Sequence, residues 1–217
     1  MNERTSPRRK RADGEESRRR ILDAAAEIAG ERGYDGTSIA AISARSGLPA
    51  SSIYWHFADK DELIAAVIER SFERWLTALS LPGEELGGAA ERTRAMAAAV
   101  AKALLDTPDF LRLGLMLTLE RRPAEPTARA KFLQVREIAR QRVAAAFRPL
   151  APDLDDAAMH LLTTYALAGA DGLFIAREIG GGNVDLAALF DLHARVLVRM
   201  LAGDLDASSP ATPGKNP

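Results

Sequence analysis

Apolar residues return at helical spacing along almost the whole chain, and this pattern restricts the fold more than any other feature. Between Leu186 and Leu201 the apolar side chains recur every three or four residues, so they line one face of a helix. No run of alternating Val, Ile or Thr residues indicates a β-strand. Ala, Leu, Arg and Glu, which favour helices, dominate the composition. The sequence therefore predicts an all-α protein.

Glycine and proline residues divide this pattern into about nine helices. Thr37 is expected to cap the second helix, and Gly47 is expected to end it. Asp59, followed one turn later by Glu62, matches the capping box that starts a fourth helix. The helices are expected near residues 17–33, 37–47, 50–56, 59–79, 86–106, 109–121, 125–148, 153–179 and 185–202.

Composition excludes several kinds of site. The 217 residues include no cysteine, which excludes disulfides, thiolate metal sites and cysteine nucleophiles. The three histidines are too scattered to indicate a metal cluster. No apolar stretch reaches the roughly 18 residues of a membrane span, and no apolar segment of a secretory signal follows the basic N-terminus. We therefore expect a cytoplasmic protein with no metal, no cofactor and no membrane partner.

Positive charge is concentrated at the N-terminus. Residues 1–20 hold eight Arg or Lys residues against four Asp or Glu residues, although the whole chain has a net charge of −1. Such a basic segment suggests contact with a polyanion, and a solvated arm is the alternative interpretation. Residues 1–15 and 204–217 lack apolar periodicity, so we expect both to be disordered.

Two short helices joined by a glycine turn are predicted between Thr37 and Lys60, in the sequence TSIAAISARSGLPASSIYWHFADK. This is the helix-turn-helix arrangement, at about residues 38–57, whose second helix enters a DNA major groove about 12 Å wide. The buried face that locks the two helices together is expected to comprise Ile39, Ile42, Leu48 and Ile53.

Residues 17–77 resemble the DNA-binding domain of the TetR/AcrR family of transcriptional regulators. The resemblance implies a DNA-binding domain at 16–77 and an effector-binding and dimerisation domain at 80–203. The second domain resembles the family only in architecture, so it identifies no ligand. The matching motifs, in order, are 20–25 (RILDAA), 33–38 (GYDGTS), 42–47 (ISARSG), 53–57 (IYWHF) and 59–63 (DKDEL).

The resemblance also implies which residues contact DNA. Thr37 would cap its helix beside a phosphate, where the helix N-terminus favours an anion, and a cap without DNA contact is the alternative. Lys60 would contact a phosphate at the start of the fourth helix. The implied DNA-binding residues are Thr37, Ser38, Ala50, Ser51, Ser52, Tyr54, Trp55, His56 and Lys60.

The recognition segment leaves some assignments open. Ala50 and Ser51 fall at positions that face the groove in the family. Trp55 is consistent with core packing as well as DNA contact, and His56 with a surface histidine. Pro49 stands where many relatives have Ser or Thr, so one polar contact is missing.

The C-terminal helices are implied to form a homodimer and to hold an effector. The apolar face of 185–202 and the small residues of 166–172 fit helices that approach a second copy closely. The expected interface residues are Phe190, Val196, Leu197 and Met200. An effector pocket within 86–148, whose lining residues are equally consistent with core, would comprise Leu104, Leu105, Phe110, Leu113, Met116 and Leu117.

These features together predict a dimeric repressor of transcription. It would bind a near-palindromic operator in double-stranded DNA and would be released by a small, mostly apolar ligand. An activator, or a DNA-binding protein that needs no ligand, remains open. A helical protein-interaction module conflicts with the Thr37–Lys60 pattern. An all-α transferase lacks a catalytic constellation, because Asp155 and Asp156 only start a helix and Gly180–Gly182 lacks the Lys of a phosphate loop. We therefore do not expect an enzyme.

Overall fold

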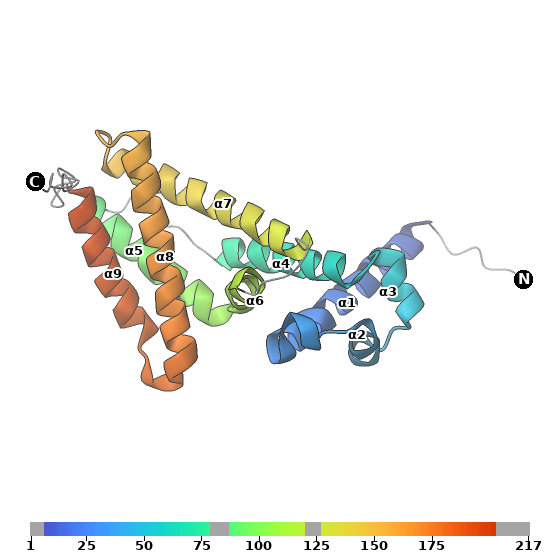
Figure 1. The fold of residues 1–217 in the computed structure, drawn as a ribbon. Helices are drawn as coiled ribbons and strands as arrows, with labels where there is room; N and C mark the ends of the chain where they lie inside the picture. The colour runs from blue at the N-terminus through green and yellow to red at the C-terminus, as the bar shows by residue number, and fades with distance from the viewer. Residues whose placement is uncertain (1–6, 79–86, 120–126, 203–217) are drawn as a thin grey trace, which may run out of the picture. The chain divides into compact units, whose positions relative to one another are not determined.

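The structure is a computed structural model that describes residues 7–78, 87–119 and 127–202 (Figure 1). Within these ranges the chain forms nine α-helices and no β-strand, which confirms the all-α prediction. No helix in them is both long enough and apolar enough to cross a membrane. The α-helices are α1 (Pro7–Gly36), α2 (Ile39–Ser46), α3 (Ala50–His56), α4 (Lys60–Ala78), α5 (Ala89–Asp106), α6 (Asp109–Leu119), α7 (Thr127–Phe147), α8 (Asp156–Gly180) and α9 (Leu186–Leu201), with 3-10 turns η1 (Arg148–Leu150) and η2 (Gly181–Asn183).

The helices fall into two compact units. The first unit contains α1 to α4, the end of α5, all of α6 and the first half of α7. The second contains the rest of α5 and α7, together with α8 and α9. The chain thus leaves the first unit after α4, near the predicted domain boundary, but returns to it at Leu104. The limits 16–77 and 80–203 remain a prediction about function, and the packing groups α6 with the helix-turn-helix.

Helix α1 begins well before the expected start near Ser17. Residues 7–15, which we expected to be disordered, form its first turns, so that prediction was wrong for them. Pro7 is tolerated there, because the first residue of a helix needs no N–H donor. The rest of the expected tails, residues 1–6 and 204–217, lies outside the described ranges.

The predicted end and start signals of the early helices are present. Gly47 adopts a left-handed conformation with φ 66° and ends α2, as expected. The Glu62 amide donates to Asp59 at 2.8 Å, and the Ala58 amide donates to the Glu62 carboxylate at 2.6 Å. The first bond confirms Asp59 as the cap of α4, and in the second Glu62 reaches back to the residue before the cap, where a standard capping box would use the amide of Asp59 itself.

The first unit is built around α1, which packs against α2, α3, α4 and α6. Of the expected lock between α2 and α3, Ile42 and Ile53 are fully buried, whereas Ile39 and Leu48 are half-buried. An aromatic cluster joins α4, α6 and α7, with neighbouring ring centroids 5.1 to 6.1 Å apart. Its members are Phe72, Trp75, Phe110 and Phe132.

The predicted effector residues divide between core and surface of the first unit. Leu105 and Met116 are exposed, and their effector role remains a prediction. The effector role of the other four, which are buried, remains a prediction, and Phe110 among them belongs to the aromatic cluster. These four are Leu104, Phe110, Leu113 and Leu117.

The α9 residues that were predicted to form the dimer interface lie mostly in the interior of the protomer. Phe190 and Leu197 are only 2% and 4% exposed, and Leu197 lies in the core of the second unit. Met200 packs against that core, and only Val196 is exposed. The apolar face of α9 is therefore covered within the protomer, largely by α8. The large apolar side chains that remain exposed on α8 and α9 are Leu161, Tyr165, Ile175, Ile179, Leu192 and Val196.

Candidate nucleic-acid interface

The N-terminus of α2 is capped by Ser38, and not by Thr37 as predicted. The Ser38 hydroxyl accepts a hydrogen bond from the Ala41 amide at 3.1 Å. Thr37 is 1% exposed, and its hydroxyl donates to the Gly33 carbonyl at 2.7 Å. The turn at Gly33 directs Thr37 inward, so the next residue reaches the cap position. Ser38 is exposed and stands at the positive end of α2, where an anion is favoured.

The turn between α2 and α3 is fixed to its surroundings by hydrogen bonds. The Ser43 hydroxyl donates to the Leu48 carbonyl at 2.7 Å, across the turn. From α1, the Arg20 guanidinium donates to the Ser46 carbonyl at 2.6 Å. The sequence interpretation treated Arg20 only as part of a motif. These bonds hold α3 in one orientation relative to α1.

Helix α3 presents a polar and aromatic outer face. Ile53, like Phe57 just after the helix, is buried and anchors it to the unit. Ser51 is exposed, as are Tyr54 and Trp55, the latter by 76%, which excludes a core role for Trp55. The half-buried residues among those predicted to bind DNA are Ala50, Ser52 and His56.

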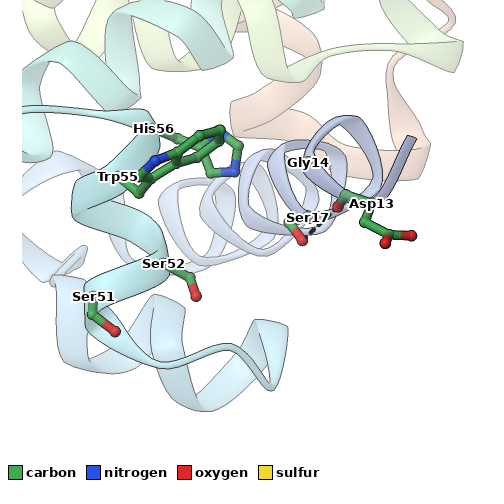
Figure 2. Close-up of a pocket in the computed structure, with 7 residues that line it drawn as sticks. All are labelled: Asp13, Gly14, Ser17, Ser51, Ser52, Trp55 and His56. Carbon is green, nitrogen blue, oxygen red and sulfur yellow. Dashed lines mark hydrogen bonds between the residues drawn. The ribbon is translucent and has the colours of Figure 1, made fainter. Parts of the chain in front are cut away.

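A hollow of about 390 Å³ lies between α3 and the start of α1 (Figure 2). On its α3 side the rings of Trp55 and His56 meet edge to face, with centroids 4.5 Å apart. On its α1 side Gly14 faces the Trp55 ring, and a Cβ atom there would make an ordinary contact with the ring at 3.8 Å. The α1 side of the hollow was not predicted, because residues 1–15 were expected to be disordered and residues 7–15 instead belong to α1. The lining residues are Asp13, Gly14, Ser17, Ser51, Ser52, Trp55 and His56.

Two side chains near the end of α3, those of His56 and Lys60, interact closely with their surroundings. Burial, and then the nearby Arg18, lowers the pKa of His56 below its ordinary value. The Lys60 ammonium donates to the Tyr34 carbonyl at 3.2 Å and lies 4.1 Å from the Tyr34 ring centroid. Any contact of Lys60 with a phosphate must therefore be made from this position against α1.

The part of the chain that holds this helix-turn-helix is similar in sequence to known regulatory proteins. Residues 21–67 match the family described as bacterial regulatory proteins, tetR family. Residues 21–67 therefore lie in a DNA-binding domain of the TetR family. This family and the relatives matched are transcriptional regulators and not enzymes.

The similarity to TetR-family proteins is strongest in the helix-turn-helix domain. The HTH-type transcriptional regulator AcrR of Shigella flexneri is 34% identical over 64 residues, and the match covers only 30% of each chain. The HTH-type transcriptional repressor Rv1474c of Mycobacterium tuberculosis is 28% identical over 182 residues, or 81% of this chain and 89% of that protein. The solved structure of FadR from Bacillus subtilis, in complex with stearoyl-CoA, has a TM-score of 0.66 at 19% identity. It covers 83% of this chain and 97% of that one, and shows the shared fold.

Proposed function

We propose that this protein is a homodimeric repressor of the TetR family, which binds a near-palindromic operator and is released by a mostly apolar ligand. The single observation that supports this best is the outer face of α3. There Ser51, Tyr54 and Trp55 project from a helix anchored by buried Ile53. A short, rigidly held helix with such a face fits the major groove. Acting on DNA, the protein would be cytoplasmic.

The predicted DNA contacts divide by chemistry. Ser51, near the start of α3, would reach base edges, while Lys60 would contact a phosphate. Thr37 is buried, so its side chain is removed from the predicted contacts, and Ser38 takes the position beside a phosphate at the start of α2. Tyr54, Trp55 and the half-buried residues of α3 would pack along the groove wall.

The dimer interface that we propose is an exposed face of α8, in place of the buried face of α9. Apolar residues Leu161, Tyr165, Ile175 and Ile179 recur along α8 at helical spacing and are exposed, Ile179 by 83%. Between them Gly172 is open, since a Cβ atom there would have nothing within 4 Å. An uncovered apolar helix face with a small residue at its middle suits close packing against a second copy.

Release from the operator requires only a modest coupling free energy between ligand binding and DNA binding. To weaken operator binding 100-fold, a ligand must favour the DNA-incompetent state by about 2.7 kcal/mol. The solved FadR with stearoyl-CoA suggests an acyl chain as the first ligand to test. In this chain Trp75 supports a ligand with a hydrogen-bond acceptor. Its indole nitrogen is buried without a partner among the described residues, beside the apolar rings of Phe72 and Phe110.

The test begins with selection of tight-binding duplexes from random DNA. The selected sequences should be near-palindromic, and sedimentation should show one protein dimer on each duplex. Stearoyl-CoA should then weaken binding, whereas CoA without the chain should not. Transcription from a promoter that overlaps the selected site should fall when the protein is added. Failure to select any sequence would refute DNA recognition, and increased transcription would identify an activator.

A further inference from the structure

One carboxylate connects three helices of the first unit. Asp61, in the first turn of α4, accepts a hydrogen bond from the Tyr34 hydroxyl at 3.0 Å. It also accepts hydrogen bonds from the backbone amides of Thr127 and Ala128, and the Ala128 nitrogen lies 3.4 Å from each carboxylate oxygen. Asp61 therefore bonds to the end of α1 and to the beginning of α7 at the same time.

The start of α7 depends on this carboxylate. Thr127 and Ala128 are the first two residues of α7, and the first amides of a helix have no partner within it. A negative charge is also favoured at a helix N-terminus. Asp61 supplies both from a position 66 residues earlier in the chain. A change in the position of α7 would therefore disturb Asp61 directly.

Tyr34 links Asp61 to the helix-turn-helix. It is buried, and its carbonyl accepts from the Thr37 amide and from the Lys60 ammonium, each at 3.2 Å. Thr37 directly precedes Ser38, the cap of α2. Consecutive residues of α4, Lys60 and Asp61, therefore hold Tyr34 at its carbonyl and at its hydroxyl.

We propose that Asp61 is a positioning residue that couples the start of α7 to the α1–α2 junction (residues 33–38) through Tyr34. Helix α7 runs on to Phe147, and its second half belongs to the second unit. Displacement of α7 by a ligand would release Tyr34 and lower the affinity for DNA. By reciprocity, DNA would hold α7 in its bound position. The inference rests on the proposed function, because it concerns regulation of the same DNA-binding site.

Two variants break the connection from opposite sides without changing charge. Tyr34→Phe removes the hydroxyl that donates to Asp61. Thr127→Pro removes an amide donor at the first position of α7, where proline is compatible with a helix. Asp155→Ala is a matched control, because Asp155 caps α8 by accepting from the Ala158 amide at 2.7 Å and lies in the second unit.

The measurement is affinity for a duplex selected by the wild-type protein, at a temperature where each variant is folded. Tyr34→Phe and Thr127→Pro should each weaken binding at least about fivefold. The double variant should have the same affinity as whichever single variant binds DNA less tightly, because both changes break the same connection through Asp61. The Asp155→Ala control should bind like wild type, even where it lowers the melting temperature.

A second readout does not need DNA. Amide hydrogen exchange in α2 should become faster in Thr127→Pro, although that change lies far from α2 in sequence, and should stay unchanged in Asp155→Ala. If Thr127→Pro alters neither α2 exchange nor duplex affinity, Asp61 is only a helix cap and the coupling is wrong. If the wild-type protein selects no duplex, the proposed function fails, and the exchange result alone decides the coupling.

Discussion

Replacing Gly33 with alanine is expected to destabilise the protein strongly. Gly33 has φ 70° and ψ −175°, a region essentially restricted to glycine, and another residue there carries strain of about 1–3 kcal/mol. The new Cβ atom would lie 2.6 Å from the Met116 methyl, and displacing that flexible side chain costs about 0.5–1.5 kcal/mol. Reduced entropy of the unfolded chain offsets about 0.4–1 kcal/mol of this. The free energy of unfolding should fall by about 1–4 kcal/mol.

The same helix offers a control of opposite sign. Gly30 lies one turn earlier in α1, and a Cβ atom there would meet only the Asp109 carboxylate at an ordinary 3.7 Å. Alanine is better than glycine inside a helix by about 0.5–1 kcal/mol, so Gly30→Ala should be more stable than wild type. Urea denaturation followed by circular dichroism measures both variants. If Gly33→Ala unfolds at the same urea concentration as Gly30→Ala, the strain argument is refuted.

Three further predictions concern the interfaces and pH. Ile179→Glu should yield a folded monomer in sedimentation, and a variant that stays dimeric would contradict the α8 interface. Lys60→Ala should weaken binding to all duplexes about equally in gel-shift titrations, whereas Ser51→Ala should change the preferred sequence; the reverse pattern would overturn the two assignments. Burial and Arg18 lower the pKa of His56 in the folded protein from its ordinary value of 6.5. As the pH falls, the unfolded chain therefore protonates His56 before the folded protein does, and the free energy of unfolding decreases as the pH drops through 6.5. His56→Asn should lose less stability than wild type over this range, as measured by urea midpoints; equal losses would exclude His56 as the cause.

The parts of the fold that sequence could predict are those set by neighbouring residues. Gly47 and the Asp59 cap act within one turn of the chain, and both have the expected conformation. The choice between Thr37 and Ser38 as the cap of α2 could not be made this way. Both side chains are able to cap, and the turn at Gly33, which buries Thr37, decides between them.

The candidate site and the interfaces depend more on contacts between distant segments. The apolar face of α9 indicated correctly that something covers Leu197, but a pattern does not say whether that partner is α8 or a second copy. The partners of Asp61 lie at Thr127 and Ala128, so no local motif suggests the connection. On α3 the sequence predicted that Ile53 is buried, but it left Trp55 open between core and DNA contact, and the 76% exposure of Trp55 decides against the core.

The two tryptophans of the chain occupy different environments, and this gives the protein two intrinsic fluorescent reporters. Trp55 is exposed on α3, whereas Trp75 is buried against Phe72 and Phe110. An indole in water emits at longer wavelength than one among apolar rings, so the two signals differ in colour. With Trp75 replaced by Phe, emission reports on α3 alone; with Trp55 replaced by Phe, it reports on the aromatic cluster. DNA binding and events in the interior of the first unit can thus be followed separately without an added label.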